Sequence, residues 1–153
     1  MEYVRAERKD SPEIIGLVRE VWKEYDCILN IDIEERHLLD PGEHFRGKGG
    51  DFWIVREKGI LVATAGLSIE EDTAEMKTLY VRKDARGRGL GTKLTNLALE
   101  TAKERGAKSI ELWSDTRFVD AHRMYERLGF VRFGERDLFD HNNTREYGYR
   151  RHI

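Results

Sequence analysis

The segment from residue 86 to residue 91 carries the residue types best suited to chemistry. It reads Arg86-Gly87-Arg88-Gly89-Leu90-Gly91 and leads into an amphipathic stretch with helical periodicity. Glycine disfavours a helix by about 1 kcal/mol relative to alanine, but its missing Cβ lets a ligand approach the backbone. The unpaired amides and the dipole at a helix start favour an anion. The segment therefore predicts a phosphate-binding loop at the start of a helix.

The charge around this loop supports the same interpretation. Asp84 is the one acidic residue between positions 82 and 93, against five basic residues. Other phosphate motifs fit less well, because a dinucleotide fingerprint requires glycine where Thr92 stands, and a Walker A loop requires Gly-Lys-Ser or Gly-Lys-Thr at its end. The alternative is a glycine-rich strand-to-helix connection with a solvated basic rim. The density of glycine and positive charge favours the phosphate site.

Hydrophobic periodicity predicts the elements that position the loop. Strands are expected near Val4 and over residues 52–55, 60–63, 74–81, 109–113, 130–133 and 146–150. Helices are expected over residues 11–25, 33–39, 90–105 and 119–128, the second of them ending before Asp40-Pro41-Gly42. The segment 43–50 is expected to be a glycine-bearing loop. The order β-α-α-β-β-β-α-β-α-β-β predicts a mixed sheet, with the strands around residues 74–113 paired in parallel.

Composition limits the class of protein. The 153 residues fit one domain over residues 1–153, and 39% hydrophobic with 37% charged residues is typical of a soluble protein. A net charge of -2 argues against nucleic acid as a partner, and no apolar run is long enough to predict a membrane partner. A single cysteine, Cys27, and the absence of a signal-like start lead us to expect a cytoplasmic protein.

Three motifs resemble those of the GNAT superfamily of N-acetyltransferases. Val81 to Leu94, which contains the glycine loop, is similar to the family's cofactor motif Q/R-x-x-G-x-G/A. Residues 121–130 resemble its second signature, a helix ending in Y-E-x-L-G-F. Ala74-Glu75-Met76 looks like the opening of the family's fourth strand. The motifs follow family order and spacing and cover residues 74–133.

The resemblance implies an α/β fold, with a central mixed sheet flanked by helices on both faces. It also implies acetyl transfer from acetyl-coenzyme A, with the pyrophosphate on the glycine loop, the pantetheine arm along the preceding strand, and the thioester near Ser114. The cofactor-binding residues carried over are Leu79, Tyr80, Val81, Arg86, Gly87, Arg88, Gly89, Leu90, Gly91 and Thr92. One position departs from the family, because Phe118 stands where an asparagine often contacts the cofactor. That contact is left unassigned.

Acetyl transfer to an amine requires a base and an acid. A lysine-like amine has a pKa of about 10.4, so its proton must be removed at neutral pH. Glu75 is the candidate base, directly or through water; the alternative is a solvated carboxylate beside Lys77. Tyr125 is the candidate acid for the leaving thiolate; the alternative is a packing role on an apolar helix stripe. A backbone amide near Tyr80 is the candidate oxyanion donor, and His122 ranks lower as a base.

The acceptor site is predicted between the early helices and the segment before the last strand. Aspartates there suit a cationic amine, an arginine suits a carboxylate-bearing one, and both together suit an amino acid. The candidates are Trp22, Tyr25, Asp26, Asp115, Arg117, Asp140 and His141. Loop capping or surface charge is the alternative role for each. The five histidines lack metal-site spacing, so no metal is expected.

The sequence thus predicts an N-acetyltransferase that moves an acetyl group from acetyl-coenzyme A to a primary amine of a small molecule or protein. The alternative is a non-catalytic module that binds acyl-coenzyme A for regulation. The identity of the acceptor, the base and the oligomeric state, with a homodimer among the possibilities, stay open.

Overall fold

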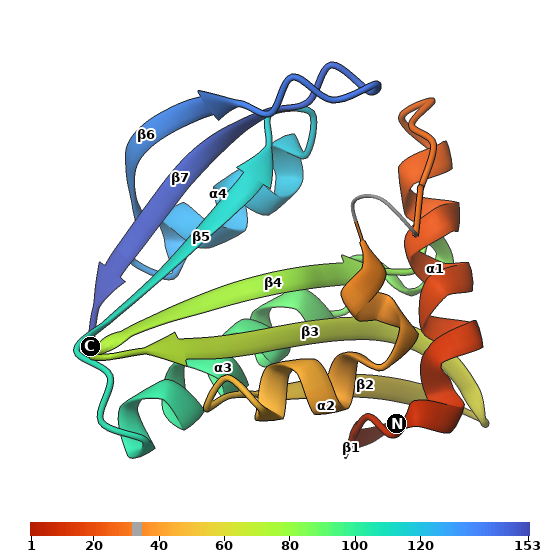
Figure 1. Cartoon of the computed structure of the whole chain (residues 1–153), viewed down its shortest axis with the longest axis horizontal. Helices are drawn as coiled ribbons and strands as arrows, with labels where there is room; N and C mark the ends of the chain where they lie inside the picture. Colours follow the sequence, from red (N-terminus) through yellow and green to blue (C-terminus); the bar gives the residue numbers. More distant parts are fainter. Residues whose placement is uncertain (32–34) are drawn as a thin grey trace.

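The computed structural model of the chain describes residues 1–31 and 35–153, which form one sheet with helices on both of its faces (Figure 1). The strands are β1 (Glu2–Arg5), β2 (Asp51–Glu57), β3 (Ile60–Glu70), β4 (Thr73–Val81), β5 (Ser109–Asp115), β6 (Val131–Asp137) and β7 (Arg145–His152). The α-helices are α1 (Ser11–Lys23), α2 (Pro41–Arg46), α3 (Leu90–Glu104) and α4 (Val119–Arg127). Short 3₁₀ turns are η1 (Arg8–Asp10), η2 (Arg36–Leu39) and η3 (Lys83–Ala85).

The sheet is mixed, in the order β1-β2-β3-β4-β5-β7-β6. Its parallel pair is β4 with β5, which α3 connects, and the other neighbours are antiparallel. The mixed α/β architecture and the parallel pairing predicted from the sequence are therefore confirmed. The turn between β2 and β3 lies at Lys58 (φ 52°) and Gly59 (φ 80°), a pair of left-handed residues that suits a tight hairpin.

Two apolar clusters cover the two faces of the sheet. Helices α1 and α2 pack on one face, where the buried side chains include Ile14, Leu17, Val18, Phe45, Phe52 and Ile54. Helices α3 and α4 pack on the other face, where they include Leu90, Leu94, Ala98, Met124, Ala74 and Ile110. In Figure 1, α2 lies in front of β2 and β3, whereas α3 and α4 lie behind the strands. The sheet is thus held on both sides as the sequence predicts.

The prediction for the second helix is wrong in position. The described part of residues 33–39 forms the 3₁₀ turn η2, whereas 33 and 34 lie outside the described residues. Helix α2 occupies part of the segment expected to be a loop, and it begins at Pro41. Asp40 caps it, because its side chain accepts a hydrogen bond from the Glu43 amide at 3.3 Å. An Asp-Pro pair is a helix start signal, whereas the prediction from the sequence places the end of the preceding helix there.

In residues 1–31 and 35–153, no helix has the length and apolar character needed to cross a lipid bilayer.

Candidate active site

Strands β4 and β5 separate after only a short paired stretch. Thr73 to Met76 pair with Ser109 to Leu112, and the pairing ends there. On the other edge of β4 the register with β3 shifts, so that Thr64 and Gly66 face Tyr80 and Lys77. This bulge places Thr78 at a φ of 58°, where a β-branched residue is rare. The bulge turns β4 away from β5 and opens the gap between them that is visible in Figure 1.

The first of two cavities at this gap lies at the start of α3, and we call it the loop cavity. It has a volume of about 590 Å³. The end of β4, the glycine loop, the first turn of α3 and one side of α4 line it. Of the ten candidate cofactor residues, all except Arg88 lie on this wall. The structure therefore gathers the residues of the cofactor motif around one cavity.

The glycines of the loop cavity have two different structural roles. Gly87 and Gly89 have φ values of 78° and 80°, a conformation that other residues rarely adopt, and a Cβ on either would meet no atom within 4 Å. Space above their backbone is therefore open. A Cβ on Gly91 would lie 3.1 Å from the Met124 sulfur, so this glycine allows α4 to pack close to α3. Gly89 is the N-cap of α3 and offers no side chain to its first amides.

The arginines of the loop are more fully paired than the sequence suggested. Arg86 forms two hydrogen bonds of 2.7 Å to the carboxylate of Glu24, and Arg88 lies 2.8 Å from the carboxylate of Glu57. The expectation that Asp84 alone opposes the basic residues is therefore wrong, because Glu24 and Glu57 come from distant segments. Arg88 points toward Glu57 of β2 and is the cofactor candidate that does not line the loop cavity.

Sequence analysis missed two arginines on the loop cavity. Arg123 and Arg127 lie one helical turn apart on α4 and line its wall, together with Asp120. Their spacing in the sequence could have indicated that they act together, because residues four apart on a helix share a face. They occupy the same helix as the second family signature. The positive charge of the loop cavity therefore comes from α4 as well as from the glycine loop.

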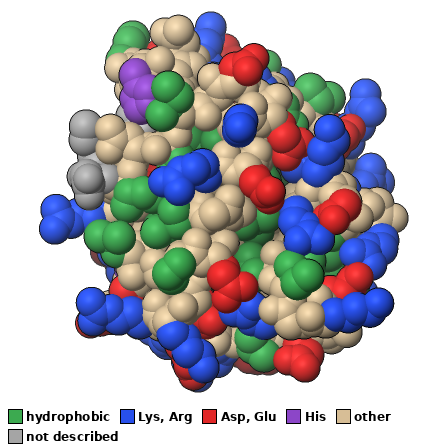
Figure 2. Space-filling view, turned by 90° about the vertical axis from the view of Figure 1, so that its right-hand side faces the viewer, with side chains coloured by type: hydrophobic (Ala, Val, Ile, Leu, Met, Phe, Trp, Pro, Cys, Tyr) green, Lys and Arg blue, Asp and Glu red, His purple; other side chains and the backbone are tan. Residues whose placement is uncertain are grey.

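The second cavity occupies the space between the diverging strands, and we call it the strand-gap cavity. Its volume is about 360 Å³, and α1, β4, β5, α4 and the segment before β7 line it. It shares a boundary with the loop cavity, made by Tyr25, Leu79, Tyr80, Phe118 and Ala121. Figure 2 looks onto the face that carries α1, where hydrophobic surface lies in a hollow between charged side chains. The two cavities therefore meet along the end of β4.

Tyr125 lies on the wall of the strand-gap cavity. Its side chain is buried against Phe130 and Tyr149, with ring centroids 5.7 Å away in both cases. Burial raises the pKa of the phenol well above its ordinary value. The hydroxyl therefore carries its proton throughout the neutral range.

Glu75 lies apart from both cavities. Its carboxylate is 3.4 Å from the ammonium of Lys77, and it is Lys77 that lines the strand-gap cavity. In the sheet, Glu75 faces Ser68 on one side and Glu111 on the other. The structure thus places Tyr125 on the wall of the strand-gap cavity, whereas Glu75, the candidate base, does not line this cavity. The surroundings of Glu75 fit its alternative role, a solvated carboxylate paired with Lys77, better than the role of catalytic base.

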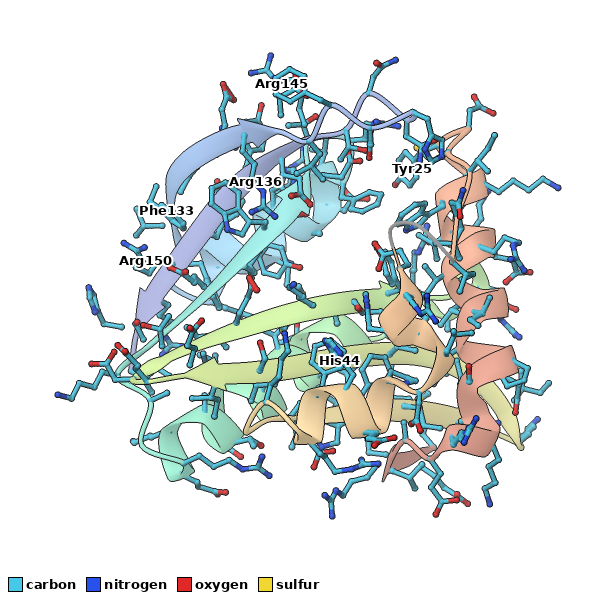
Figure 3. All side chains as sticks on the ribbon, viewed as in Figure 1. Tyr25, His44, Phe133, Arg136, Arg145 and Arg150 are labelled. Atoms are coloured by element: carbon cyan, nitrogen blue, oxygen red, sulfur yellow. The ribbon has the colours of Figure 1, made fainter. Side chains whose placement is uncertain are left out.

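The acceptor candidates divide into two groups. Trp22, Tyr25, Asp115 and Asp140 line the strand-gap cavity, whereas Asp26, Arg117 and His141 do not. In Figure 3, Tyr25 lies at the upper end of α1, beside the segment that leads into β7. The residues on this wall that sequence analysis did not propose include Glu35, Lys77, Trp113, Asn142, Thr144 and Glu146. They come from four separate segments, and no single motif indicates them.

Ser114 and Phe118 lie where the family resemblance led us to expect contact with the donor. Ser114 lines the strand-gap cavity, and its hydroxyl lies 3.2 Å from Nε2 of the buried His122. Burial lowers the pKa of His122. Phe118 lies on the boundary of both cavities and packs edge-on against Tyr25, with centroids 4.9 Å apart. At this position an aromatic ring therefore replaces the family's polar side chain.

Among residues 1–31 and 35–153, no group of three or more histidine, cysteine, aspartate or glutamate side chains is arranged to hold a metal ion.

Comparison with known families identifies the class of protein that this fold and site define. The model of the Acetyltransferase (GNAT) family matches residues 8–130. The chain therefore belongs to the GNAT family of acetyltransferases and is an acyltransferase. This confirms the resemblance inferred from the three motifs.

Individual relatives agree with the family. YjgM, an uncharacterized N-acetyltransferase of Escherichia coli K12, is 29% identical over 80% of this chain and 77% of its own length. The aminoalkylphosphonate N-acetyltransferase of Salmonella typhimurium is 29% identical over 84% of each chain. An uncharacterized N-acetyltransferase of Methanocaldococcus jannaschii is 44% identical over 61 residues, which cover 40% of this chain and 27% of its own length.

Solved structures share the fold. A GNAT acetyltransferase of Staphylococcus aureus Mu50 superposes with a TM-score of 0.85 at 22% identity, over 99% of this chain and 98% of that one. The yncA protein of Salmonella typhimurium, determined with its cofactor acetyl-CoA, gives a TM-score of 0.79 at 18% identity, over 99% and 93% of the two chains. At these identities the comparison establishes the fold alone.

Proposed function

We propose that residues 1–153 form a single acetyltransferase domain that moves an acetyl group from acetyl-coenzyme A to a primary amine. The observation that carries the proposal is the shared boundary of the two cavities. One cavity ends at a glycine-lined helix start, the other contains Tyr125, and Leu79, Tyr80 and Phe118 belong to both. A donor in the first cavity and an amine in the second would meet at the end of β4.

The loop cavity fits the diphosphate of coenzyme A. The first amides of α3 lie at its wall, and a helix start with free amides favours an anion. A Cβ atom on Gly87 or Gly89 would meet no atom within 4 Å. Phosphate oxygens therefore have room to lie against the backbone there. Arg123 and Arg127 add positive charge. We propose that these groups hold the diphosphate and that the backbone of Leu79 to Val81 holds the pantetheine arm.

Bound acetyl-coenzyme A would supply the activated acetyl thioester. In our proposal the backbone amides at the bulged end of β4, near Tyr80, stabilise the negative charge on the carbonyl oxygen. Tyr125 donates its hydroxyl proton toward the leaving sulfur, which suits a phenol that burial keeps protonated. The bulge at Thr78 positions these amides, because it frees the edge of β4 that would otherwise pair with β5.

Removal of the amine proton is assigned to the strand-gap cavity. Glu75 does not line the cavity and its carboxylate pairs with Lys77, so we propose that it acts through water if it acts as the base. The carboxylates on the wall itself, which include Asp115 and Glu146, are shorter routes for the proton. The name of the Salmonella relative specifies an aminoalkylphosphonate, which is also a primary amine, and this supports an amine acceptor here.

Release of free thiol from acetyl-coenzyme A, measured across a panel of amines, tests the proposal. We expect release that depends on the amine, near-complete loss of release in Tyr125→Phe, and a smaller loss in Glu75→Gln. Tyr3→Phe is the matched control, because Tyr3 lies on β1 and lines neither cavity. Binding of coenzyme A without release against any amine would instead support a non-catalytic binding module. Absence of coenzyme A binding would overturn both.

A further inference from the structure

The two cavities carry charge of opposite sign. Arg86, Arg123 and Arg127 line the loop cavity, against Asp120 as its acidic residue. The charged residues that line the strand-gap cavity are Glu35, Lys77, Asp115, Asp140 and Glu146. In the described part of the chain, four carboxylates therefore face one ammonium group there. Asp115 and Glu146 are each paired with an arginine, Arg117 at 3.2 Å and Arg136 at 2.8 Å, so these two carboxylates add little net charge to the wall.

The one ammonium group on this wall is largely neutralised from outside it. Nζ of Lys77 lies 3.4 Å from the carboxylate of Glu75, which does not line the cavity. Lys77 is thus a weak candidate to hold an anionic substrate group. Because Lys77 is paired with Glu75, it does little to neutralise the carboxylates on the wall of the strand-gap cavity.

Arg117, the residue that suited a carboxylate-bearing acceptor, is committed elsewhere. Its Nε lies 3.2 Å from Asp115, one Nη donates to the carbonyl of Asn142 at 2.8 Å, and the other contacts the sulfur of Cys27. It does not line the strand-gap cavity. An acceptor with a carboxylate or a phosphonate next to its amine would therefore face carboxylates without an available guanidinium.

Asp140 keeps its charge despite its hydrogen bonds. It accepts from the amides of Asn142 and Thr144 at 3.1 and 2.8 Å and from the Thr144 hydroxyl at 2.7 Å. These donors are neutral, so they hold the carboxylate in place and leave its negative charge for a ligand. By contrast, the carboxylate of Glu146 is paired with Arg136 at 2.8 Å, and in Figure 3 Arg136 lies on β6 beside the open face of the sheet.

Aromatic rings make up much of the remaining wall. Those on the strand-gap cavity are Trp22, Tyr25, Tyr80, Trp113, Phe118 and Tyr125. A hydrogen bond of 2.9 Å from the Trp22 indole to the Tyr80 hydroxyl fixes two of these rings. Aromatic faces attract ammonium groups but offer little to a carboxylate. Ring faces and carboxylates together are the chemistry that recognises an organic cation.

We propose that the acceptor is a diamine, whose second ammonium group binds the carboxylates and rings of the strand-gap cavity while its neutral amine is acetylated. This inference rests on the proposed function and specifies the substrate of the same site. A hydrocarbon spacer between the two nitrogens would pass the apolar surface of the cavity. The second ammonium group serves only in recognition and undergoes no reaction.

Three acceptors of equal chain length test the inference. They are 1,4-diaminobutane, 1-aminobutane and 4-aminobutanoate, whose distal groups are an ammonium, a methyl and a carboxylate. We expect kcat/KM in the order diamine, monoamine, amino acid, with the diamine favoured by about tenfold or more over the monoamine, the ratio that about 1.4 kcal/mol of differential binding produces. Equal or reversed rates would overturn the inference while leaving the proposed acetyl transfer in place.

If no acetylation is detected, ligand binding distinguishes failure of the diamine inference from failure of the proposed function. The emission of Trp22 and Trp113 should change when 1,4-diaminobutane is added to the protein with coenzyme A bound. Coenzyme A binding without either acetylation or an emission change would overturn the diamine and leave the donor site standing. Failure of coenzyme A itself to bind would overturn the proposed function.

Charge-neutral variants identify the recognising groups. We expect the isosteric Glu35→Gln and Asp140→Asn to lower the ratio of diamine to monoamine kcat/KM by about three- to tenfold. Glu135→Gln is the matched control, because Glu135 lies on β6, pairs with Arg145 and does not line the cavity. An unchanged ratio in both test variants would overturn the assignment, and Glu35→Gln tests it even if Asp140→Asn is unstable.

Discussion

The guanidinium of Arg86 is held by the carboxylate of Glu24, with each Nη atom 2.7 Å from a carboxylate oxygen. Its Nε also donates to the carbonyl of Val81 at 3.0 Å. These contacts join the glycine loop to the C-terminal end of α1 and to the end of β4. Because all three nitrogens are engaged, we infer that Arg86 shapes the loop cavity and that the backbone amides, Arg123 and Arg127 face the diphosphate.

Glu24→Gln tests the role of this ion pair. We expect the melting temperature to fall by about 2–4 °C, since a partly exposed pair contributes up to about 1 kcal/mol. The dissociation constant of coenzyme A should rise severalfold, because the loop loses its attachment to α1. Calorimetric titration measures the constant, and Glu20→Gln, on the exposed side of α1, is the control. Unchanged binding in Glu24→Gln would mean that the ion pair does not position the loop.

Tyr125→Phe separates binding from proton donation. The phenol is buried and its pKa is raised, so the variant should keep coenzyme A affinity while kcat falls by about 10²–10⁴-fold, the range for loss of a general acid. For the same reason the wild-type rate should not decline between about pH 8 and pH 9.5, where an ordinary phenol begins to ionise. Steady-state thiol release across this range measures both effects. A variant with wild-type kcat would leave Tyr125 with a packing role.

Gly89→Glu tests the glycine-lined helix start. It places a carboxylate where the diphosphate is proposed to bind, so coenzyme A should no longer raise the melting temperature. The φ of 80° at this position also costs about 1–2 kcal/mol for any L side chain. Gly106→Glu is the matched control, because Gly106 has a φ of 88°, open space at its Cβ position and a place at the far end of α3. Gly106→Glu should lose a similar amount of stability, but coenzyme A should still raise its melting temperature. If coenzyme A raised the melting temperature of neither variant, general destabilisation would explain the result.

His37 makes the stability of the fold depend on pH. Burial, aided by the nearby charges of His44 and Lys77, lowers its pKa to about 4; Figure 3 places His44 over β3 and β4. The ordinary value is about 6.5, so the unfolded chain binds more protons between these values. The free energy of unfolding should therefore fall as pH drops from 6.5 to 4, by at most about 3 kcal/mol. Urea unfolding of His37→Gln should show a smaller fall over this interval, and an equal fall would assign the effect to other groups.

The sequence predicts well those parts of the fold that local patterns determine. Helix α3 and its left-handed N-cap follow from the glycine loop and the periodicity of Leu90, Leu94 and Ala98. The strand order along the chain follows from turns such as Lys58-Gly59. These signals are local, because a turn or an amphipathic helix is specified by residues close together in the chain.

The remainder of the candidate site depends on contacts between distant segments. Nothing near Arg86 in the sequence indicates Glu24, which is 62 positions away, and several segments far apart in the chain form the wall of the strand-gap cavity. The bulge at Thr78 is equally hidden, because the run from Thr73 to Val81 looks like one regular strand. The bulge changes the alternation of β4 beyond Lys77, so alternation alone could not show how Thr78 to Val81 face the gap.

The two cavities share a boundary along β4 and are otherwise lined by different side chains, which has a kinetic consequence. In the proposed function the donor and the acceptor occupy separate cavities, so both can be bound to the protein at the same time. Initial-velocity plots at varied concentrations of both reactants should then give intersecting lines, the pattern of a ternary complex. Parallel lines would instead indicate that the acetyl group is stored on the protein between two half-reactions.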